Sequence, residues 1–347
     1  MSPSRSVARV GPRLVMVFCV LASLGASLWP ADQASSAELI LSGSQKIIDA
    51  PTRIAAAAGY FDADTGPRIR VELADSGTQS LEMLMAGDAD FALMTAVPLS
   101  QTLVRLHHDD APAATWPVVV ASIGFSSRIH HVIVNAGSGI EQPAELAGHA
   151  LGLTFDTSAH FAWDWFADLH GIGTDAVRLV DTRPGELGEG LAAGRFDAVV
   201  AWTPYSENIM DQRGASARRF PLQAMDSVSW LLVSRRALVE RHPEIVERVL
   251  RAYAGAIDLL HTDPDGAAEL LDLPRDWPQG KHVAWKLALN WPVIANLEAK
   301  LVWSARRSGV AALHVSPSSY IARGPLERFR SHAVSLPTWI AAGQAEQ

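Results

Sequence analysis

The chain has 347 residues, a formal net charge of −8 at pH 7 and a single cysteine. A chain of this length can bury large cores without disulfides, and two lobes of ordinary domain size fit within it. The moderately acidic balance argues against nucleic acid as a partner.

The first segment of the chain predicts export. Three arginines are followed by an uncharged apolar run over residues 14–28 and then by small residues. We therefore expect a signal peptide over residues 1–37, cleavage near Ala37 and a periplasmic protein. A membrane anchor is the alternative, but the apolar run is shorter than the ~20 residues that a spanning helix needs. Because Cys19 lies within this segment, the mature chain would have no thiol nucleophile and no cysteine metal site.

Beyond this segment, strand and helix signals alternate. Strands are expected at 38–41, 69–73, 91–94, 116–121, 131–134, 150–155 and 198–202. Helices are expected at 54–58, 81–86, 245–260, 263–271, 285–290 and 292–302. Alternation of this kind is typical of α/β proteins, in which helices cover both faces of a mainly parallel sheet.

A short sequence unit occurs twice. Residues 84–90 and 191–197 both read L-x-A-G-x-x-D, and a buried strand is expected after each copy. The glycine suits a helix C-terminus because it adopts the left-handed conformation without strain. Two copies in the same element order favour two similar α/β lobes, and one large sheet is the alternative.

Candidate binding residues follow from the position of the strands. In open α/β sheets, ligands bind beyond the carboxyl ends of the strands, where loops and helix starts converge. This rule selects Ser76, Gly77, Thr78, Thr95, Ala96, Val97, Thr157, Ser158, Ala159, His160 and Trp202. The helix start at 157–160 is a candidate anion site, because free N–H groups and the positive end of the helix dipole meet there.

Two structural interpretations compete with a binding role. Ser76 and Thr157 are also suited to cap their helices, which does not exclude contact with a ligand. Trp202 could cover a ligand with its ring and Tyr205 could donate a hydrogen bond, but most tryptophans belong to the core. We expect the other tryptophans, including Trp230, to be largely structural.

Signals for chemistry are weak. The pairs His107–His108 and His130–His131 have no carboxylate at ligand spacing, so we expect solvated or capping histidines and no metal site. Ser158 and His160 could serve as nucleophile and base, but no G-x-S-x-G elbow is present. We therefore expect no catalytic residue and no cofactor.

Several short segments, taken together, carry a resemblance. They are residues 75–77, 84–90, 98–99, 139–140, 145–148, 155–160, 171–172, 194–197, 202–204 and 238–243. Their order and spacing resemble the nitrate/sulfonate/taurine group of periplasmic ABC-importer binding proteins, which belongs to the thiamine-pyrimidine-binding-like superfamily. The resemblance covers most of the chain from residue 39 to about 271.

The resemblance implies a bilobal, hinge-closing fold of the type II periplasmic-binding class. Residues 38–126 and 235–347 would form the first lobe, and residues 127–234 the second. A monomer of this kind would bind a small organic anion, sulfonate-like, and deliver it to a membrane permease with its ATPase. The ligand contacts implied are Ser44 and Gln45, the strand-end residues already selected, and an acid before Trp230, for which Asp226 is the nearest residue.

Two departures bear on the ligand. Val228 stands closer than Asp226 to the place where the taurine-binding relatives have an acid, which argues against an amine-bearing solute. Asp156 would repel a sulfonate at the helix start unless it points away. A thiamine-pyrimidine precursor is an alternative ligand, although the cysteine-rich motif of the related enzymes is absent. An enzyme or a receptor-docking sensor that uses the same cleft is a further alternative.

Overall fold

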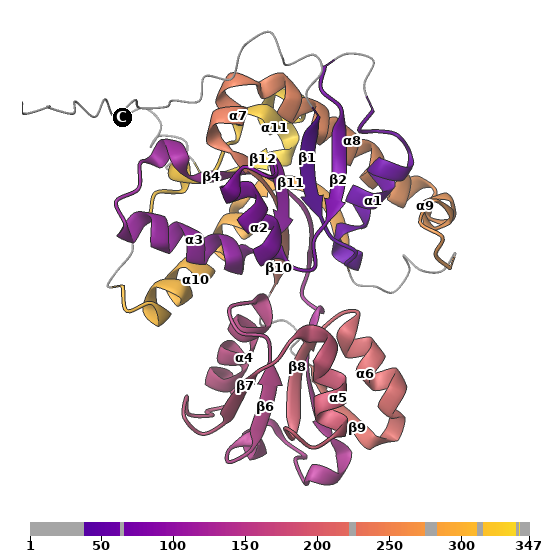
Figure 1. The fold of residues 1–347 in the computed structure, drawn as a ribbon, viewed down its shortest axis with the longest axis vertical. Coiled ribbons are helices and arrows are strands. Elements are labelled where there is room, and N and C mark those ends of the chain that lie inside the picture. The colour runs from indigo at the N-terminus through magenta and orange to yellow at the C-terminus, as the bar shows by residue number, and fades with distance from the viewer. Residues whose placement is uncertain are drawn as a thin grey trace, which may run out of the picture.

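The computed structural model describes residues 38–62, 66–221, 227–274, 283–310, 315–337 and 340. These residues fold into two α/β lobes, which lie one above the other in Figure 1. The upper lobe, here called the large lobe, contains a seven-stranded sheet, and the lower, small lobe contains a five-stranded sheet. The expected signal peptide at 1–37 lies outside the described residues.

Each sheet has a parallel trio of strands beside an antiparallel neighbour. The large-lobe strands are β1 (Leu39–Gly43), β2 (Ile69–Leu73), β3 (Phe91–Met94), β4 (Pro117–Ser126), β10 (Val228–Arg235), β11 (Ala284–Asn290) and β12 (Val334–Ser335), in the order β12-β11-β4-β10-β3-β1-β2. The small-lobe strands are β5 (His130–Asn135), β6 (Ala150–Leu153), β7 (Arg178–Asp181), β8 (Ala198–Trp202) and β9 (Ala217–Pro221), in the order β7-β6-β8-β5-β9. β2, β1 and β3 run parallel beside antiparallel β10, as β7, β6 and β8 do beside β5.

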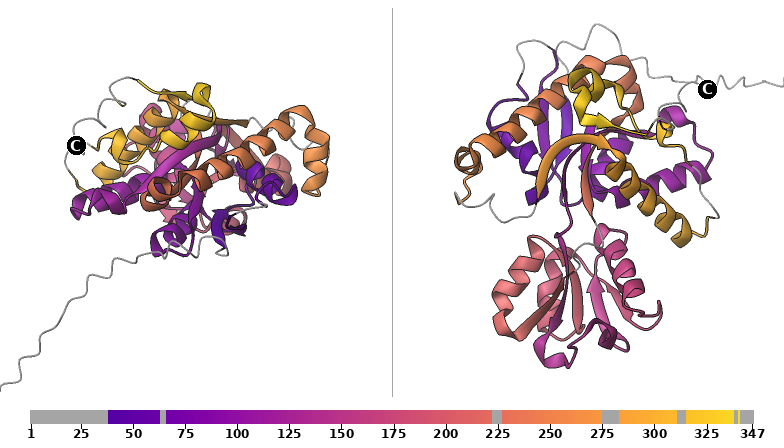
Figure 2. Two further views of the ribbon diagram at one scale, coloured as in Figure 1. Left: turned by 90° about the horizontal axis from the view of Figure 1, so that it is seen from above. Right: turned by 180° about the vertical axis from the view of Figure 1, so that it is seen from behind.

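Helices connect and cover these strands, as the views from above and behind show (Figure 2). The large lobe contains α1 (Ala50–Ala57), α2 (Gly77–Ala86), α3 (Ala96–His108), α7 (Arg236–Arg241), α8 (Pro243–Thr262), α9 (Pro264–Leu270), α10 (Trp291–Arg307) and α11 (Gly324–Phe329). The small lobe contains α4 (Ser158–Leu169), α5 (Leu187–Ala192) and α6 (Tyr205–Arg213). The bilobal α/β fold expected from the sequence is confirmed.

The repeated sequence unit has the same geometry in both lobes. Its glycine ends a helix with a positive φ, 87° in the first copy and 70° in the second. In the first copy, the Asp90 carboxylate accepts a hydrogen bond from the backbone N–H of Ile40 at 2.9 Å. In the second, the Asp197 carboxylate accepts one from the backbone N–H of Ala150 at 3.0 Å. The aspartate therefore fixes the start of the neighbouring parallel strand in each sheet, which explains its place in the motif.

The sequence interpretation was wrong for residues 285–290, which we expected to be helical. They belong to β11, which pairs antiparallel with β4. Trp285 and Leu287 are buried, whereas Lys286 between them is exposed. This alternation does not continue, since Leu287, Ala288 and Leu289 are all buried, so the pairing with β4 and not the local pattern decides for a strand.

The expected second boundary between the lobes lies close to β10. β10 belongs to the large-lobe sheet, so the boundary expected at residue 234 falls inside a large-lobe strand. We propose that the chain returns to the large lobe between Pro221 and Val228. No helix in the described part of the chain is long and apolar enough to cross a membrane.

Alternate residues of β8 serve two different cores. Val199 and Ala201 belong to an apolar cluster on one face of the small-lobe sheet, together with Phe196. Val200 and Trp202 belong to the cluster on the other face, which includes residues of α4. The strand alternation thus places the Trp202 ring on the α4 side, at the carboxyl end of the strand.

Candidate functional site

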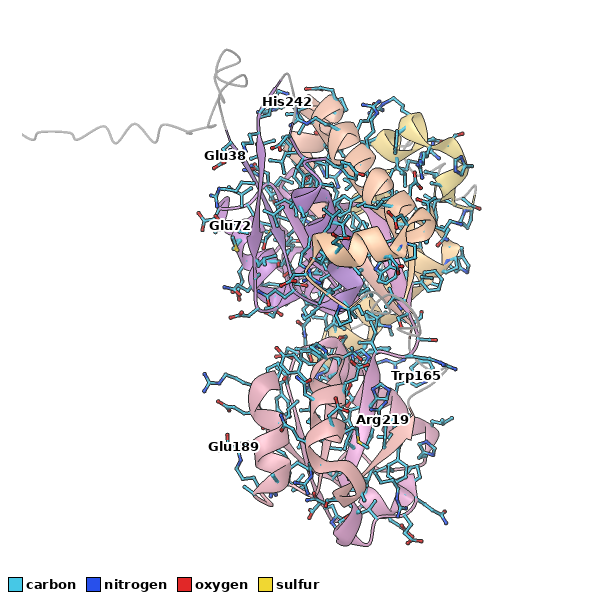
Figure 3. All side chains as sticks on the ribbon, turned by 90° about the vertical axis from the view of Figure 1, so that its right-hand side faces the viewer. Glu38, Glu72, Trp165, Glu189, Arg219 and His242 are labelled. Atoms are coloured by element: carbon cyan, nitrogen blue, oxygen red, sulfur yellow. The ribbon has the colours of Figure 1, made fainter. Side chains whose placement is uncertain are left out.

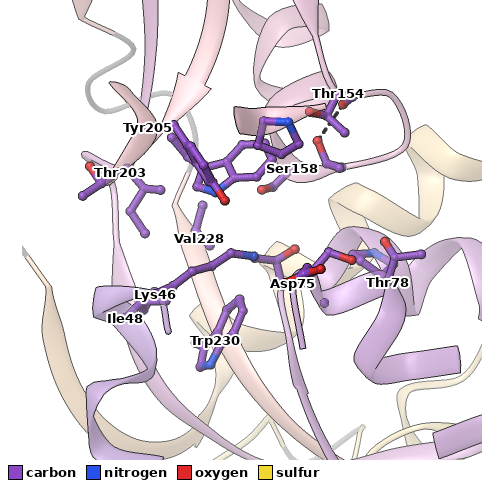
Figure 4. Close-up of a pocket in the computed structure, with 18 of the residues that line it drawn as sticks. Lys46, Ile48, Asp75, Thr78, Thr154, Ser158, Thr203, Tyr205, Val228 and Trp230 are labelled. Carbon is purple, nitrogen blue, oxygen red and sulfur yellow. Dashed lines mark hydrogen bonds between the residues drawn. The ribbon is translucent and has the colours of Figure 1, made fainter. Parts of the chain in front are cut away.

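A cavity of about 500 Å³ lies between the two lobes (Figure 4). Its lining comes from the segment after β1, the starts of α2 and α3, and β10 in the large lobe, and from the loops after β6, β7 and β8 in the small lobe. The lining residues are Lys46, Ile47, Ile48, Asp75, Ser76, Gly77, Thr78, Thr95, Pro98, Ile129, Thr154, Phe155, Thr157, Ser158, Arg183, Pro184, Trp202, Thr203, Tyr205, Val228 and Trp230. A solute in this cavity would contact both lobes at once.

The strand-end rule selected many of these residues. Of the predicted set, the residues that line the cavity are Ser76, Gly77, Thr78, Thr95, Thr157, Ser158 and Trp202. The residues not placed on its lining are Ser44, Gln45, Ala96, Val97, Ala159 and His160. Asp226 lies outside the described residues, and Val228 of β10 lines the cavity. That any of these side chains contacts a ligand stays a prediction.

The start of α2 both caps its helix and faces the cavity. The Ser76 hydroxyl accepts a hydrogen bond from the backbone N–H of Gln79 at 3.1 Å, and the Gln79 side chain accepts one from the Asp75 N–H at 2.8 Å. A Cβ on Gly77 would lie 2.9 Å from the Cβ of Met94, so only glycine lets this helix start pack against β3. Capping and exposure to the cavity therefore coexist at Ser76.

Lys46 crosses the cavity between two indole rings, one from each lobe. Its Nζ lies 5.5 Å from the ring centroids of both Trp202 and Trp230, within the range of a cation–π contact. In Figure 4 the side chain extends past Trp230 toward Asp75. Burial among these groups lowers the pKa of Lys46 to about 8, and the negative charges of Asp49 and Asp75 oppose this shift. Lys46 is therefore predominantly cationic at pH 7.

A buried carboxylate lies behind Lys46. Asp49 is fully buried and accepts hydrogen bonds from the Ser44 backbone N–H and the Thr52 hydroxyl. Burial raises the pKa of Asp49 to about 7, although the hydrogen bonds from Thr52 and Ser44 and the charge of Arg53 oppose it. Ser44 therefore does not line the cavity, and its backbone N–H helps to hold the Asp49 carboxylate.

The small lobe faces the cavity with aromatic rings and hydroxyl groups. The Trp202 and Tyr205 rings meet edge to face, with centroids 5.6 Å apart. Trp202 is 6% exposed and belongs to the apolar core of the lobe, so it is both a core residue and a lining residue. Its Nε1 has no hydrogen-bond acceptor among the described residues. The Thr157 hydroxyl donates to the Thr154 carbonyl oxygen at 2.7 Å and makes no cap hydrogen bond.

Ser158 pairs with His130 and not with His160. The Ser158 Oγ lies 2.9 Å from Nε2 of His130. Burial lowers the pKa of His130 to about 3, and the positive charges of Lys300 and Lys46 add to this effect, so the imidazole is neutral at pH 7. We expected the adjacent histidines His130 and His131 to be solvated or capping. The expectation of solvation is wrong, since His130 is 4% and His131 is 8% exposed.

Asp156 precedes the helix start of α4 and is not part of the cavity lining. The residue is exposed. Its backbone N–H donates to Nδ1 of His160 at 3.2 Å, and the buried His160 ring stacks on Phe155 with centroids 4.7 Å apart. His160 therefore holds the loop that presents Phe155. The carboxylate that borders the cavity is Asp75 instead.

The lobes also touch beside the cavity, through α4 and α10. Trp303 donates from Nε1 to the Asp164 carboxylate at 2.8 Å, and its ring meets Phe161 edge to face at 5.7 Å. The Lys300 Nζ lies 4.0 Å from the centroid of the Phe161 ring. Trp165 is half exposed on the same helix, near the junction of the lobes (Figure 3). These contacts join the lobes without lining the cavity.

The most informative lining residues that the sequence interpretation missed are Lys46, Asp75 and Trp230. Lys46 directly follows the implied contacts Ser44 and Gln45, and Asp75 belongs to the loop that supplied Ser76. The predicted contacts Ser44, Gln45 and Ser76 could therefore have pointed to both residues as lining residues. Trp230 is 1% exposed and reaches the cavity from the middle of β10, which no strand-end rule selects.

In the described part of the chain, no group of three or more His, Cys, Asp or Glu is placed to hold a metal ion.

Solved structures share this fold. The alkanesulfonate-binding protein SsuA from Xanthomonas axonopodis pv. citri, bound to MOPS, superposes with a TM-score of 0.68 at 18% identity over 84% of this chain and 100% of that one. The nitrate-binding protein NrtA from Synechocystis PCC 6803 gives 0.63 at 12% identity over 86% and 89%. The desulfurization enzyme DSZB gives 0.58 at 16% identity over 85% and 99%.

At these identities, the superpositions establish the periplasmic-binding-protein fold. No curated protein sequence matches this chain. A model of the NMT1/THI5-like family matches residues 49–267, which is more than half of the chain, and the protein therefore belongs to this family.

Proposed function

We propose that this chain is the solute-binding component of an ABC importer and that it captures a small organic anion in the cavity between its lobes. The observation that carries the proposal is a cavity lined by strand ends and helix starts of both lobes, with the Lys46 cation between them. A solute there would hold the lobes together, and a permease can recognise that joined state. The binding proteins among the structural neighbours support the same role.

The proposal assigns the contacts as follows. Lys46 supplies the counter-charge, the helix starts at Ser76–Thr78, Thr95 and Thr157–Ser158 supply N–H donors, and Thr78 and Thr95 add hydroxyl groups. Trp202 covers the solute from the small lobe. The protein would act as a periplasmic monomer after removal of residues 1–37, with a membrane permease and its ATPase as partners.

A thermal-shift panel tests this function. Nitrate, methanesulfonate, benzoate and benzenesulfonate are compared with glucose and a neutral aminopyrimidine, each at constant ionic strength. A solute at one hundred times its Kd stabilises the folded state by about 2.7 kcal/mol. We expect at least one anion to raise the melting temperature and the neutral solutes to leave it unchanged. A rise with the aminopyrimidine alone would favour a thiamine-precursor binder, and no rise with any anion would contradict the proposal.

The export step has its own test. N-terminal sequencing of the protein recovered from a periplasmic fraction should begin near Glu38. Recovery of full-length chain in the membrane fraction would instead support an anchored protein.

One observation favours a second candidate, an enzyme that uses the same cavity. Ser158 and His130 form a hydroxyl–imidazole pair at the cavity wall. However, burial and two nearby lysines disfavour protonation of His130, which a general base must undergo. We therefore rank binding above catalysis. Incubation of the protein with many equivalents of each binding solute, followed by mass spectrometry, should return the solute unchanged, and turnover that depends on Ser158 would reverse the ranking.

A further inference from the structure

The cavity is larger than an anionic head group. At about 30 Å³ for each water-sized group, the few heavy atoms of a sulfonate or carboxylate occupy only a small part of the roughly 500 Å³ available. The solute that fills this space therefore has a body as well as a charged head. The chemistry of the walls indicates what kind of body it is.

Four aromatic side chains line the cavity: Phe155, Trp202, Tyr205 and Trp230. Trp202 and Trp230 belong to different lobes, and both lie 5.5 Å from the same Nζ atom, so they border one position from two sides. Aromatic groups gain from edge-to-face and offset contacts that saturated groups of equal area do not make. These walls favour a flat, unsaturated body.

Two hydrogen-bond donors, one from each lobe, lack a strong acceptor at the cavity among the described residues. Lys46 carries its charge at the position between the indoles, and the Trp202 Nε1 is unpaired within the described part of the chain although Trp202 is only 6% exposed. A buried donor without an acceptor destabilises the protein, and an anionic oxygen would satisfy it. Asp75 borders the same cavity and would repel a second negative charge on the solute.

On the basis of the proposed function, we propose that the solute is an aromatic monoanion, with its acidic head group on Lys46 and Trp202 and its ring among the aromatic walls. Lys46 is then the residue that selects for charge, and the two indoles select for a flat body. Because Lys46 and Trp230 come from the large lobe and Trp202 from the small lobe, all three contacts form together only when the lobes are joined.

Isothermal titration of the purified protein with four matched probes, and with benzene-1,3-disulfonate as an added comparison, tests the inference. Benzenesulfonate carries both features, cyclohexanesulfonate lacks the flat ring, methanesulfonate lacks the body, and benzenesulfonamide lacks the charge. We expect benzenesulfonate to bind about tenfold more tightly than cyclohexanesulfonate, a difference of about 1.4 kcal/mol. The other two probes should bind more weakly still. Benzene-1,3-disulfonate should bind more weakly than benzenesulfonate because of Asp75.

Variants separate the charge from the ring. Lys46→Met keeps a long apolar side chain and removes the charge, so it should weaken benzenesulfonate binding at least tenfold without weakening benzenesulfonamide. Lys46→Arg should retain most of the affinity. Lys286→Met removes another lysine, exposed on β11, and serves as the matched control with wild-type affinity. Melting temperatures of all variants show whether each one is folded.

The outcomes distinguish this inference from the proposed function. Sulfonates that bind equally well with flat and saturated bodies, or that bind Lys46→Met like the wild type, would overturn the inference and leave the binding function in place. If none of the four probes or the nitrate and benzoate of the thermal-shift panel binds, the function itself is contradicted.

Discussion

The two walls of the cavity differ in chemistry. The large-lobe wall carries the charged side chains of Lys46 and Asp75 at the cavity, and Asp49, whose pKa is raised to about 7 by burial, lies behind them. The small-lobe wall presents the Trp202 and Tyr205 rings and several hydroxyl groups, and its buried histidine is neutral. The one cationic side chain of the small-lobe wall, Arg183, pairs with Glu186 at 2.5 Å and is largely exposed.

With two different walls, one site can select its solute both by charge and by shape. A charged wall discriminates by the sign and number of charges on the solute, whereas an aromatic wall discriminates by shape and flatness. Neither wall alone encloses a solute, so both selections apply only when the lobes are together.

The largest expected effect concerns Trp230, which serves the large-lobe core as well as the cavity. Trp230 is 1% exposed, so Trp230→Ala should lower the free energy of unfolding by about 3–5 kcal/mol. Trp165→Ala, at a tryptophan that is 47% exposed, is the matched control and should cost less than about 1 kcal/mol. Urea denaturation measures both. Similar losses for the two variants would show that the large-lobe wall is not a packed core.

The next effect concerns the unpaired donor of the small-lobe wall. Trp202→Phe keeps an aromatic ring and removes Nε1, so it should weaken anion binding by about tenfold, or about 1.4 kcal/mol. Because Trp202 is 6% exposed, the smaller ring should also lower the free energy of unfolding, by about 0.5–3 kcal/mol. Trp165→Phe is the control and should bind as the wild type does. Calorimetric titration with benzenesulfonate measures the change. Unaltered affinity in Trp202→Phe would show that Nε1 does not contact the anion.

A third effect concerns the contact of α4 with α10. Asp164→Ala removes the carboxylate that accepts from Trp303 at 2.8 Å and pairs with Arg307 at 3.5 Å, and the lost hydrogen bond between the lobes is worth about 1 kcal/mol. The ligand-free variant should populate separated lobes more often, and small-angle scattering should show a larger radius of gyration than in the wild type. Saturating solute should abolish the difference. An unchanged radius in the ligand-free state would mean that the cavity walls alone hold the lobes.

The smallest effect is a shift of the pH profile of binding. Because the pKa of Lys46 is lowered to about 8, the cation that an anion needs is lost as the pH rises through about 8, and affinity should fall there. Asp49 and Asp75 raise this pKa, and Asp49 is the larger contributor. His130, which also faces Lys46, stays neutral across this range. Asp49→Asn should therefore move the fall to lower pH, as titrations between pH 6 and 9 would show, and an unmoved profile would refute the coupling.

Local patterns in the sequence predicted the architecture well. The alternation in residues 69–73 predicted β2, and the repeated glycine–aspartate unit predicted two lobes built alike, because these features depend on local periodicity and turn geometry. The segment of β11 was misassigned because a short apolar run has no decisive period of its own. Its pairing with β4 fixes its conformation.

The site was predictable only in part. Helix starts such as Ser76 and Ser158 directly follow predicted strands along the chain, so the sequence alone could select them. The position of Lys46 between Trp202 and Trp230 depends on how two lobes meet, and the pairing of Ser158 with His130 depends on the register of β5. Such contacts join residues far apart in the chain, and no local pattern encodes them.

The most direct test of the central claim is a crystal structure of the protein with benzenesulfonate. The account predicts a sulfonate oxygen within about 2.7–3.2 Å of the Lys46 Nζ, and the ring in contact with Trp202 and Trp230. A solute bound outside the cavity, or inside it with its acid group turned away from Lys46, would contradict the account.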